Sequence, residues 1–201
     1  MTTPFSIRRR TLVLASVAAP LLLAACSKPY VFNGVDITGV PYANGFALTD
    51  FDGRQRTLSD FVGKVVVMYF GYTQCPDICP ASMQVVASAM DELGDKSRDV
   101  QFLFVTVDPQ RDTPEILKAY VTHFNPTFLA LTGTPQQIEQ TARAFKVYYK
   151  KVPGKTPGSY TMDHTAGFYV FDPKGKIRLF EREGVEPGPF AQDLRALIDG
   201  H

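Results

Sequence analysis

The feature that most constrains the fold is an alternation of strand-length apolar runs with segments that carry helix-start signals. The apolar runs cover residues 64–70, 102–107 and 128–131. Runs of this kind are typical of parallel strands that are covered on both faces. A first-turn proline marks an expected helix start after each run, at Pro80, Pro114 and Pro135. Thr113 and Thr134 precede two of these prolines as N-caps. The alternation predicts an α/β domain that begins with parallel strands.

The second half of the domain predicts antiparallel pairing. Residues 166–171 and 176–180 are expected to form a hairpin, and a final amphipathic helix follows them. Further strands are expected at residues 46–50, 55–58 and 147–152. Parallel strands first and an antiparallel hairpin last resemble a thioredoxin-like fold. We therefore expect a three-layer α/β domain with a mixed central sheet and helices on both faces.

Residues 1–25 have the composition of an export signal. Three consecutive arginines precede an apolar run that is too short for a comfortable membrane span. The run ends in Leu23-Ala24-Ala25-Cys26, which resembles the bacterial lipobox, a signal whose cysteine is lipidated and becomes the first mature residue. We expect a lipoprotein signal peptide (1–25), a membrane tether (26–45) and a folded domain (46–201), lipid-anchored at Cys26 on the periplasmic side of a bacterial membrane. The alternatives are an ordinary secretory signal and an uncleaved anchor.

The charge balance and the cysteine count narrow the possible functions. The chain has 21 Lys plus Arg against 20 Asp plus Glu, so no broad positive field favours nucleic acid. It has three cysteines, an odd number. If Cys26 carries lipid, two cysteines remain, and both lie in one motif in an oxidising compartment.

The motif Cys75-Pro76-Asp77-Ile78-Cys79-Pro80 follows the first buried run and precedes the first expected helix. A helix N-terminus favours negative charge, so we expect the pKa of both thiols to be lowered. Thiolate is both a metal ligand and a redox nucleophile, and the position alone does not choose between these roles. Thioredoxin-type enzymes have two residues between their cysteines, whereas this motif has three. The upstream Pro and Thr that a peroxiredoxin needs are replaced by Met68 and Tyr72.

His164 is the histidine expected to face the two cysteines. It lies in an expected loop, 161–165, where thioredoxins have a cis-proline opposite the active cysteine. A purely structural, hydrogen-bonded histidine is the alternative. His123 and His201 are expected at the surface. Two thiolates and an imidazole suit Cu(I), and the imidazole also makes Cu(II) tolerable, whereas zinc sites usually take four ligands.

Three blocks carry a specific resemblance, at residues 69–80, 107–114 and 163–165. In this order they resemble the Sco/SenC family, membrane-tethered thioredoxin-fold copper proteins that help to assemble cytochrome c oxidase. The resemblance runs from about Phe46 to the C-terminus and implies that Cys75, Cys79 and His164 are the copper ligands. A lipobox stands where many members have a transmembrane helix.

The resemblance implies a metallochaperone rather than a turnover enzyme. Its expected role is to deliver copper to the CuA centre of cytochrome c oxidase subunit II, to reduce the cysteines of that centre, or both, with other periplasmic copper carriers as further partners. The alternatives are a thiol–disulfide oxidoreductase acting on exported proteins and, third, a thiol peroxidase. Asp163 is a candidate for orienting the His164 imidazole, or else a turn residue. The Asp108–Pro114 block is expected to be a capped strand-to-helix turn, with a role in shaping the rim of the site as the alternative and Arg111 as a candidate partner contact. A group of lysines is expected on a solvated face, with recognition of an acidic partner surface as the alternative: Lys146, Lys150, Lys151 and Lys155.

Overall fold

The computed structural model describes residues 30–201, in which an eight-stranded mixed sheet has the order β1-β10-β9-β4-β5-β6-β2-β3. The expected signal peptide and Cys26 lie outside the described residues. The strands of this sheet are β1 (Val35–Asp36), β2 (Ala47–Asp50), β3 (Gln55–Thr57), β4 (Val65–Gly71), β5 (Val100–Thr106), β6 (Leu129–Thr132), β9 (Gly167–Phe171) and β10 (Ile177–Arg182). Strands β4, β5 and β6 are parallel, and β9 and β10 add antiparallel pairs on the other side of β4.

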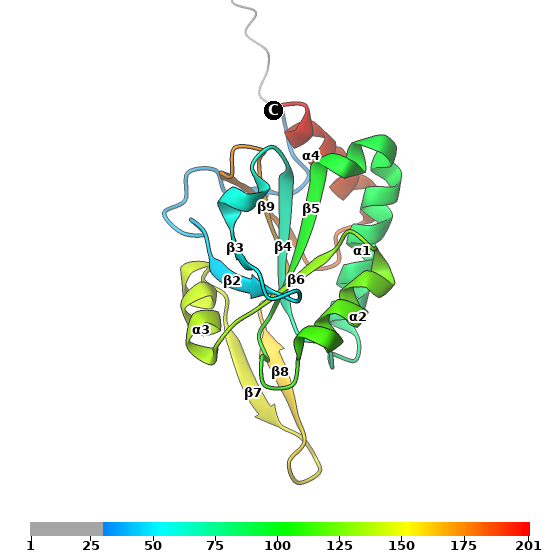
Figure 1. Cartoon of the computed structure of the whole chain (residues 1–201). Helices are drawn as coiled ribbons and strands as arrows, with labels where there is room; N and C mark the ends of the chain where they lie inside the picture. Colours follow the sequence, from blue (N-terminus) through cyan, green and yellow to red (C-terminus); the bar gives the residue numbers. More distant parts are fainter. Residues whose placement is uncertain (1–29) are drawn as a thin grey trace, which may run out of the picture.

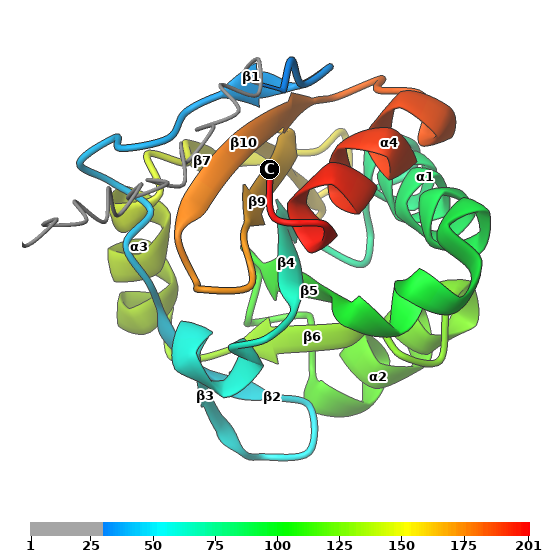
Figure 2. The ribbon, with the colours of Figure 1, turned by 90° about the horizontal axis from the view of Figure 1, so that it is seen from above.

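Helices cover both faces of the sheet, as expected (Figure 1). Three of them pack on one face: α1 (Ile78–Leu93), α2 (Pro114–Phe124) and α4 (Pro187–Ile198). The fourth, α3 (Pro135–Ala144), covers the opposite face, as the view down the sheet shows (Figure 2). Every residue of β4 is buried between these layers. The three-layer α/β prediction is confirmed.

The helix starts follow the capping signals in two of three cases. The Thr113 side chain accepts a hydrogen bond from the Ile116 amide, and Thr134 and Gln137 form a reciprocal capping box. The expected start of α1 at Pro80 is wrong, because the helix begins at Ile78 with Asp77 as N-cap. Cys79 therefore lies inside the first helical turn rather than before it.

The segment around His164 is not the expected loop. Strands β7 (Tyr149–Pro153) and β8 (Tyr160–His164) pair with each other as a separate two-stranded sheet, and this hairpin projects beyond the main sheet (Figure 1). Met162 is buried, whereas Thr161 and Asp163 on either side of it are exposed, which is the alternation of a strand with one face on the domain. His164 is the last residue of β8.

Part of the expected tether packs on the domain, so ordered structure begins before residue 46. Strand β1 pairs with β10, and Ala43 is buried. The backbone amides of Asn33 and Gly34 donate to the carboxylate of Asp193 in α4. Backbone hydrogen bonds form without any apolar periodicity in the sequence, so the pairing of this Gly- and Pro-rich segment could not be predicted from its side chains. Among residues 30–201 no helix is long and apolar enough to cross a membrane.

Candidate metal centre

Two cysteines and one histidine converge where β4 and β5 end. Cys75 lies in the loop after β4, Cys79 in the first turn of α1, and His164 at the end of β8. One sulfur or nitrogen atom from each lies within 4.8 Å of the other two. Within residues 30–201 this is the one such group of three or more His, Cys, Asp or Glu side chains. The structure thus brings together the three residues that the sequence selected.

Cys79 is the protected member of the group. Its side chain is fully buried, and its sulfur lies 3.5 Å from Nε2 of His164. The Tyr69 hydroxyl, from the middle of β4, donates to the same sulfur at 3.8 Å. Gly71 makes this packing possible, since a Cβ atom there would lie 2.9 Å from the Cys79 sulfur. Cys79 is therefore held by core packing.

Cys75 is the accessible member and differs from Cys79 in its protonation. A hydrogen bond from the Cys79 thiol, together with the amides of Asp77, Ile78 and Cys79, lowers the pKa of Cys75 to about 5 despite partial burial. The same hydrogen bond, followed by burial, raises the pKa of Cys79. The expectation that both thiols have a lowered pKa is wrong for Cys79, because the Cys79 thiol keeps its proton and donates a hydrogen bond to the Cys75 thiolate. The reduced pair is one thiolate and one thiol.

The imidazole of His164 is held in a defined orientation. Its Nδ1 lies 3.1 Å from the carbonyl oxygen of Thr165. Because a carbonyl only accepts, this contact puts the proton on Nδ1 and leaves the Nε2 lone pair facing Cys79. The rings of Tyr69 and Tyr72 contact the imidazole edge to face, at centroid distances of 6.1 and 6.0 Å.

Asp163 does not orient the imidazole. Its side chain is exposed, and successive residues of a strand point to opposite faces, so it faces away from His164. The backbone carbonyl of Thr165 takes the place that the sequence assigned to the carboxylate. Asp163 and His164 are neighbours in sequence, but the alternation of side chains along β8 places them on opposite faces of the strand.

The block 107–114 does more than turn the chain. Asp112 is buried and accepts hydrogen bonds from the hydroxyls of Thr73 and Thr106, both at 2.6 Å, and from the Thr73 amide. Burial raises the pKa of Asp112. These bonds join the start of α2 to the loop that carries Cys75. The block therefore holds the loop that carries Cys75 in place, in addition to capping α2.

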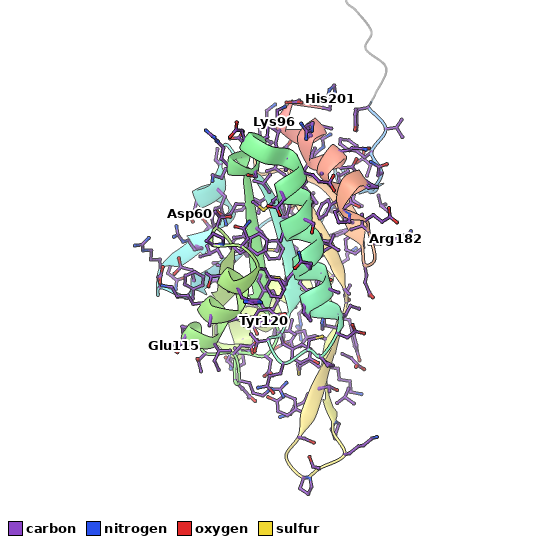
Figure 3. The ribbon with its side chains drawn as sticks, turned by 90° about the vertical axis from the view of Figure 1, so that its right-hand side faces the viewer. Asp60, Lys96, Glu115, Tyr120, Arg182 and His201 are labelled. Carbon is purple, nitrogen blue, oxygen red and sulfur yellow. The ribbon has the colours of Figure 1, made fainter. Side chains whose placement is uncertain are left out.

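The remaining candidate residues lie outside the group. His123 and His201 are exposed, and His201 lies at the end of the domain opposite the β7–β8 hairpin (Figure 3). All four lysines of the expected basic group are exposed. Two of them lie over tyrosine rings, Lys146 over Tyr42 at 4.3 Å and Lys151 over Tyr160 at 3.6 Å.

The donor set fits a soft metal ion. Two sulfurs and an imidazole nitrogen whose lone pair faces them are the ligand types that Cu(I) prefers, and three ligands satisfy its low coordination number. The same two sulfurs are close enough for thiol–disulfide exchange. The arrangement is thus chemically able to hold a metal or to shuttle electrons.

Several residues that support the site carry no functional motif in the sequence. Tyr69 belongs to the expected buried run 64–70 and both Tyr69 and Gly71 belong to the block 69–80, but neither was assigned a role at the site, and Thr165 acts through its backbone. A signal existed for Tyr69, because a hydroxyl inside a fully buried strand requires a partner. No pattern of side chains in a sequence predicts that a backbone carbonyl will be the hydrogen-bond partner of a histidine.

Comparison with known proteins identifies the family. The family model described as SCO1/SenC matches residues 37–199. The human mitochondrial protein named SCO1 homolog is 35% identical over 159 residues, which cover 78% of this chain and 53% of the human protein. The SCO2-like protein of Rickettsia felis is 38% identical over 138 residues, covering 68% of this chain and 67% of that protein. The chain spans about half the length of the human and yeast relatives that it matches.

Solved structures agree with these relatives. Bradyrhizobium japonicum ScoI with copper bound has a TM-score of 0.70 at 38% identity and covers 76% of this chain and 97% of that chain. Apo Sco1 from Thermus thermophilus has a TM-score of 0.74 at 36% identity, with coverage of 85% and 99%. These neighbours confirm the thioredoxin-like fold. Since the family model spans most of the domain and the relatives exceed 30% identity along it, the chain belongs to the SCO1/SenC family.

Proposed function

We propose that this chain binds copper through Cys75, Cys79 and His164 and acts as a copper chaperone in the assembly of cytochrome c oxidase. The observation that carries the proposal is the convergence of two sulfurs and an oriented imidazole nitrogen within 4.8 Å of one another. The copper-bound structures of the Bradyrhizobium japonicum and Arabidopsis thaliana ScoI proteins, at 38% and 33% identity, support copper as the ion.

The site is suited to transferring a metal ion rather than keeping it. Cu(I) is bound by the Cys75 thiolate, by Cys79 after loss of its proton, and by Nε2 of His164; the imidazole also supports Cu(II). Cys75 is only partly buried, so an incoming ligand from a partner reaches the ion on that side. The cargo is then passed on by stepwise exchange of ligands.

The proposed recipient is the CuA centre of cytochrome c oxidase subunit II, and other periplasmic copper carriers are the proposed donors. Reduction of the recipient's cysteines is a second function that the same residues can perform. In that step the Cys75 thiolate attacks a partner disulfide, and Cys79 then resolves the mixed disulfide. Two electrons pass to the partner, which gains two thiols while Cys75 and Cys79 become a disulfide.

A general thiol–disulfide oxidoreductase acting on exported proteins is the second candidate. The lowered pKa of Cys75, about 5, favours it, because a thiolate is the attacking species in exchange. In this case copper binding is incidental and the His164 imidazole is dispensable. His164 therefore discriminates between the two candidates.

The proposed location is the periplasmic side of a bacterial membrane. Cleavage after residue 25 and lipidation of Cys26 anchor the chain, and the residues between Cys26 and the packed N-terminal segment form the tether. A SCO1/SenC family lipoprotein from Bacillus anthracis, 26% identical, supports a lipid anchor. Metabolic labelling with a fatty-acid analogue tests it, with Cys26→Ser as the unlabelled control.

The experiment that tests the function is an anaerobic Cu(I) titration against a chromogenic chelator. The full chain with Cys26→Ser is used, so that Cys75 and Cys79 supply the only thiols. We expect tight 1:1 binding that either Cys75→Ser or Cys79→Ser abolishes and that His164→Ala weakens by more than about tenfold, or about 1.4 kcal/mol. His123→Ala is the matched control. Affinity unchanged in both cysteine variants refutes the copper proposal, and affinity indifferent to His164 favours the oxidoreductase.

A further inference from the structure

Arg111 connects three segments that surround the site. Its Nε forms an ion pair with Oδ2 of Asp108, and its Nη1 donates to Oε1 of Gln74 at 3.0 Å and to the Tyr160 carbonyl oxygen at 2.9 Å. The guanidinium lies 3.6 Å from the centre of the Tyr160 ring and 5.7 Å from that of Tyr72. Four-fifths of the side chain is buried. This is a fixed contact, not a free surface arginine.

The connected segments carry the ligands of the site. Gln74 directly precedes Cys75, and Tyr160 is the first residue of β8, the strand that ends at His164. Arg111 itself follows β5. The guanidinium therefore bridges the cysteine loop and the strand that bears the histidine.

The β7–β8 hairpin depends on such contacts for its position. Its two strands pair only with each other, and Figure 1 shows the hairpin extending away from the main sheet. Its His164 end continues into β9 at Gly167, and side-chain contacts, in place of a backbone ladder, hold the rest of the hairpin against the domain. The Tyr160 hydroxyl donates to Oδ1 of Asp108 at 3.0 Å, so Tyr160 is held at its ring, its hydroxyl and its carbonyl by the Asp108–Arg111 pair.

We propose that Arg111 is a positioning residue for the metal site. It clamps Tyr160, at the end of β8 next to the hairpin turn, against the loop that carries Cys75, and thereby keeps β8 oriented so that Nε2 of His164 stays beside the sulfur of Cys79. The inference rests on the proposed function, in that copper binding uses His164. It differs from an ordinary stabilising ion pair, because the clamp also needs the planar stacking surface and a second donor nitrogen, which lysine lacks.

A double-mutant cycle measures the clamp. Cu(I) affinity is determined for the full chain with Cys26→Ser, alone and with Arg111→Ala, His164→Ala or both. We expect Arg111→Ala to weaken binding by about 10- to 100-fold, as for other residues that orient metal ligands, and to have almost no effect once His164 is alanine. Unchanged affinity in Arg111→Ala overturns the inference. So does an equal loss in both backgrounds, because Arg111 would then act through the cysteines or the fold.

Arg111→Lys and Arg56→Ala complete the set of variants. Arg111→Lys keeps the charge opposite Asp108, and we expect it to resemble Arg111→Ala; full rescue by lysine refutes the clamp. Arg56 is the matched control, since it also pairs with an aspartate, Asp50 at 2.8 Å, and faces an aromatic ring, Phe61 at 6.0 Å. Its loss should leave copper affinity unchanged.

A measurement on the reduced, metal-free chain separates this inference from the proposed function. The contacts of the His164 ring with Tyr69 and Tyr72 predict nuclear Overhauser effects between their ring protons. We expect these effects to be lost in Arg111→Ala and Arg111→Lys but retained in Arg56→Ala. If the nuclear Overhauser effects are retained in both Arg111 variants, the clamp is overturned, regardless of the copper affinities that are measured. Failure of the parent chain to bind copper, with the effects lost as expected, instead refutes the proposed function alone.

Discussion

The protonation of the two thiols gives the most direct test of the site's geometry. With a pKa of about 5, Cys75 is about 99% thiolate at pH 7, whereas an ordinary thiol near pKa 9 is about 1% thiolate. Cys79 remains a thiol under the same conditions, because it donates a hydrogen bond to the Cys75 thiolate and its sulfur is buried. The chain should therefore present one reactive sulfur at neutral pH.

Alkylation by iodoacetamide measures this asymmetry. The reduced full chain with Cys26→Ser is labelled at a series of pH values, and each cysteine is followed by mass spectrometry. The rate at Cys75 should rise through a single inflection near pH 5 and stay constant above about pH 6, since only the thiolate reacts. Cys79 should react slowly throughout. An inflection near pH 9 for Cys75 contradicts the arrangement.

Two substitutions of Cys79 test the cause of the shift. Cys79→Ala removes the largest contribution, the hydrogen bond to Cys75, so the pKa of Cys75 should rise, while the amides of the first turn of α1 still hold it below the ordinary value. Cys79→Ser keeps a donor at the same place, so the pKa should stay low. Equal inflections in the alanine and serine variants refute the reasoning.

Three further predictions concern stability. A Cβ atom at Gly71 would contact Tyr69, Cys79 and Phe104 at 2.9 Å, so Gly71→Ala should cost about 1–3 kcal/mol in denaturant unfolding and weaken copper binding, with no effect expected from Gly53→Ala on copper. Asp112→Ala leaves the buried hydroxyl of Thr106 and the partly buried hydroxyl and amide of Thr73 without their acceptor and should cost about 2–4 kcal/mol, against a negligible change for exposed Asp95→Ala. Burial, followed by the neighbouring Asp193, raises the pKa of Glu181 to about 8, so the folded state loses stability as pH rises from 4.5 to 8. Glu181→Gln should therefore stabilise the chain by about 2 kcal/mol at pH 7, after discounting for partial screening, and by almost nothing at pH 4; exposed Glu183→Gln should change neither value, and a pH-independent difference rejects the account.

The sequence predicted the elements whose causes are local. The runs that became β4, β5 and β6 are almost entirely apolar because both faces of the sheet are covered. Thr113 and Thr134 cap their helices through bonds within one turn. Cys75, Cys79 and His164 were found because their chemistry is rare and their spacing specific.

The elements and contacts that the sequence did not predict depend on interactions between distant segments. The strand β8 has a period of two, with buried Met162 between exposed neighbours, but its five residues are too few and too polar to distinguish a strand from a loop. Strand β1 is two residues long and exists through its pairing with β10. The bonds of Arg111 and Asp112 join segments that are far apart in sequence, and a local pattern does not contain them.

The two proposed roles share most of the site, which explains why the cysteines alone do not separate them. Metal transfer and disulfide exchange both need one sulfur that a partner can reach and one that is protected, and Cys75 and Cys79 supply this pair in either case. The imidazole is different. Disulfide exchange does not require a nitrogen lone pair beside the buried sulfur, yet Thr165 fixes the tautomer of His164 and two tyrosines fix its ring in that orientation. A role as the third copper ligand explains why a histidine on a separate hairpin is held in this orientation. The arrangement therefore favours the copper role over that of a simple dithiol.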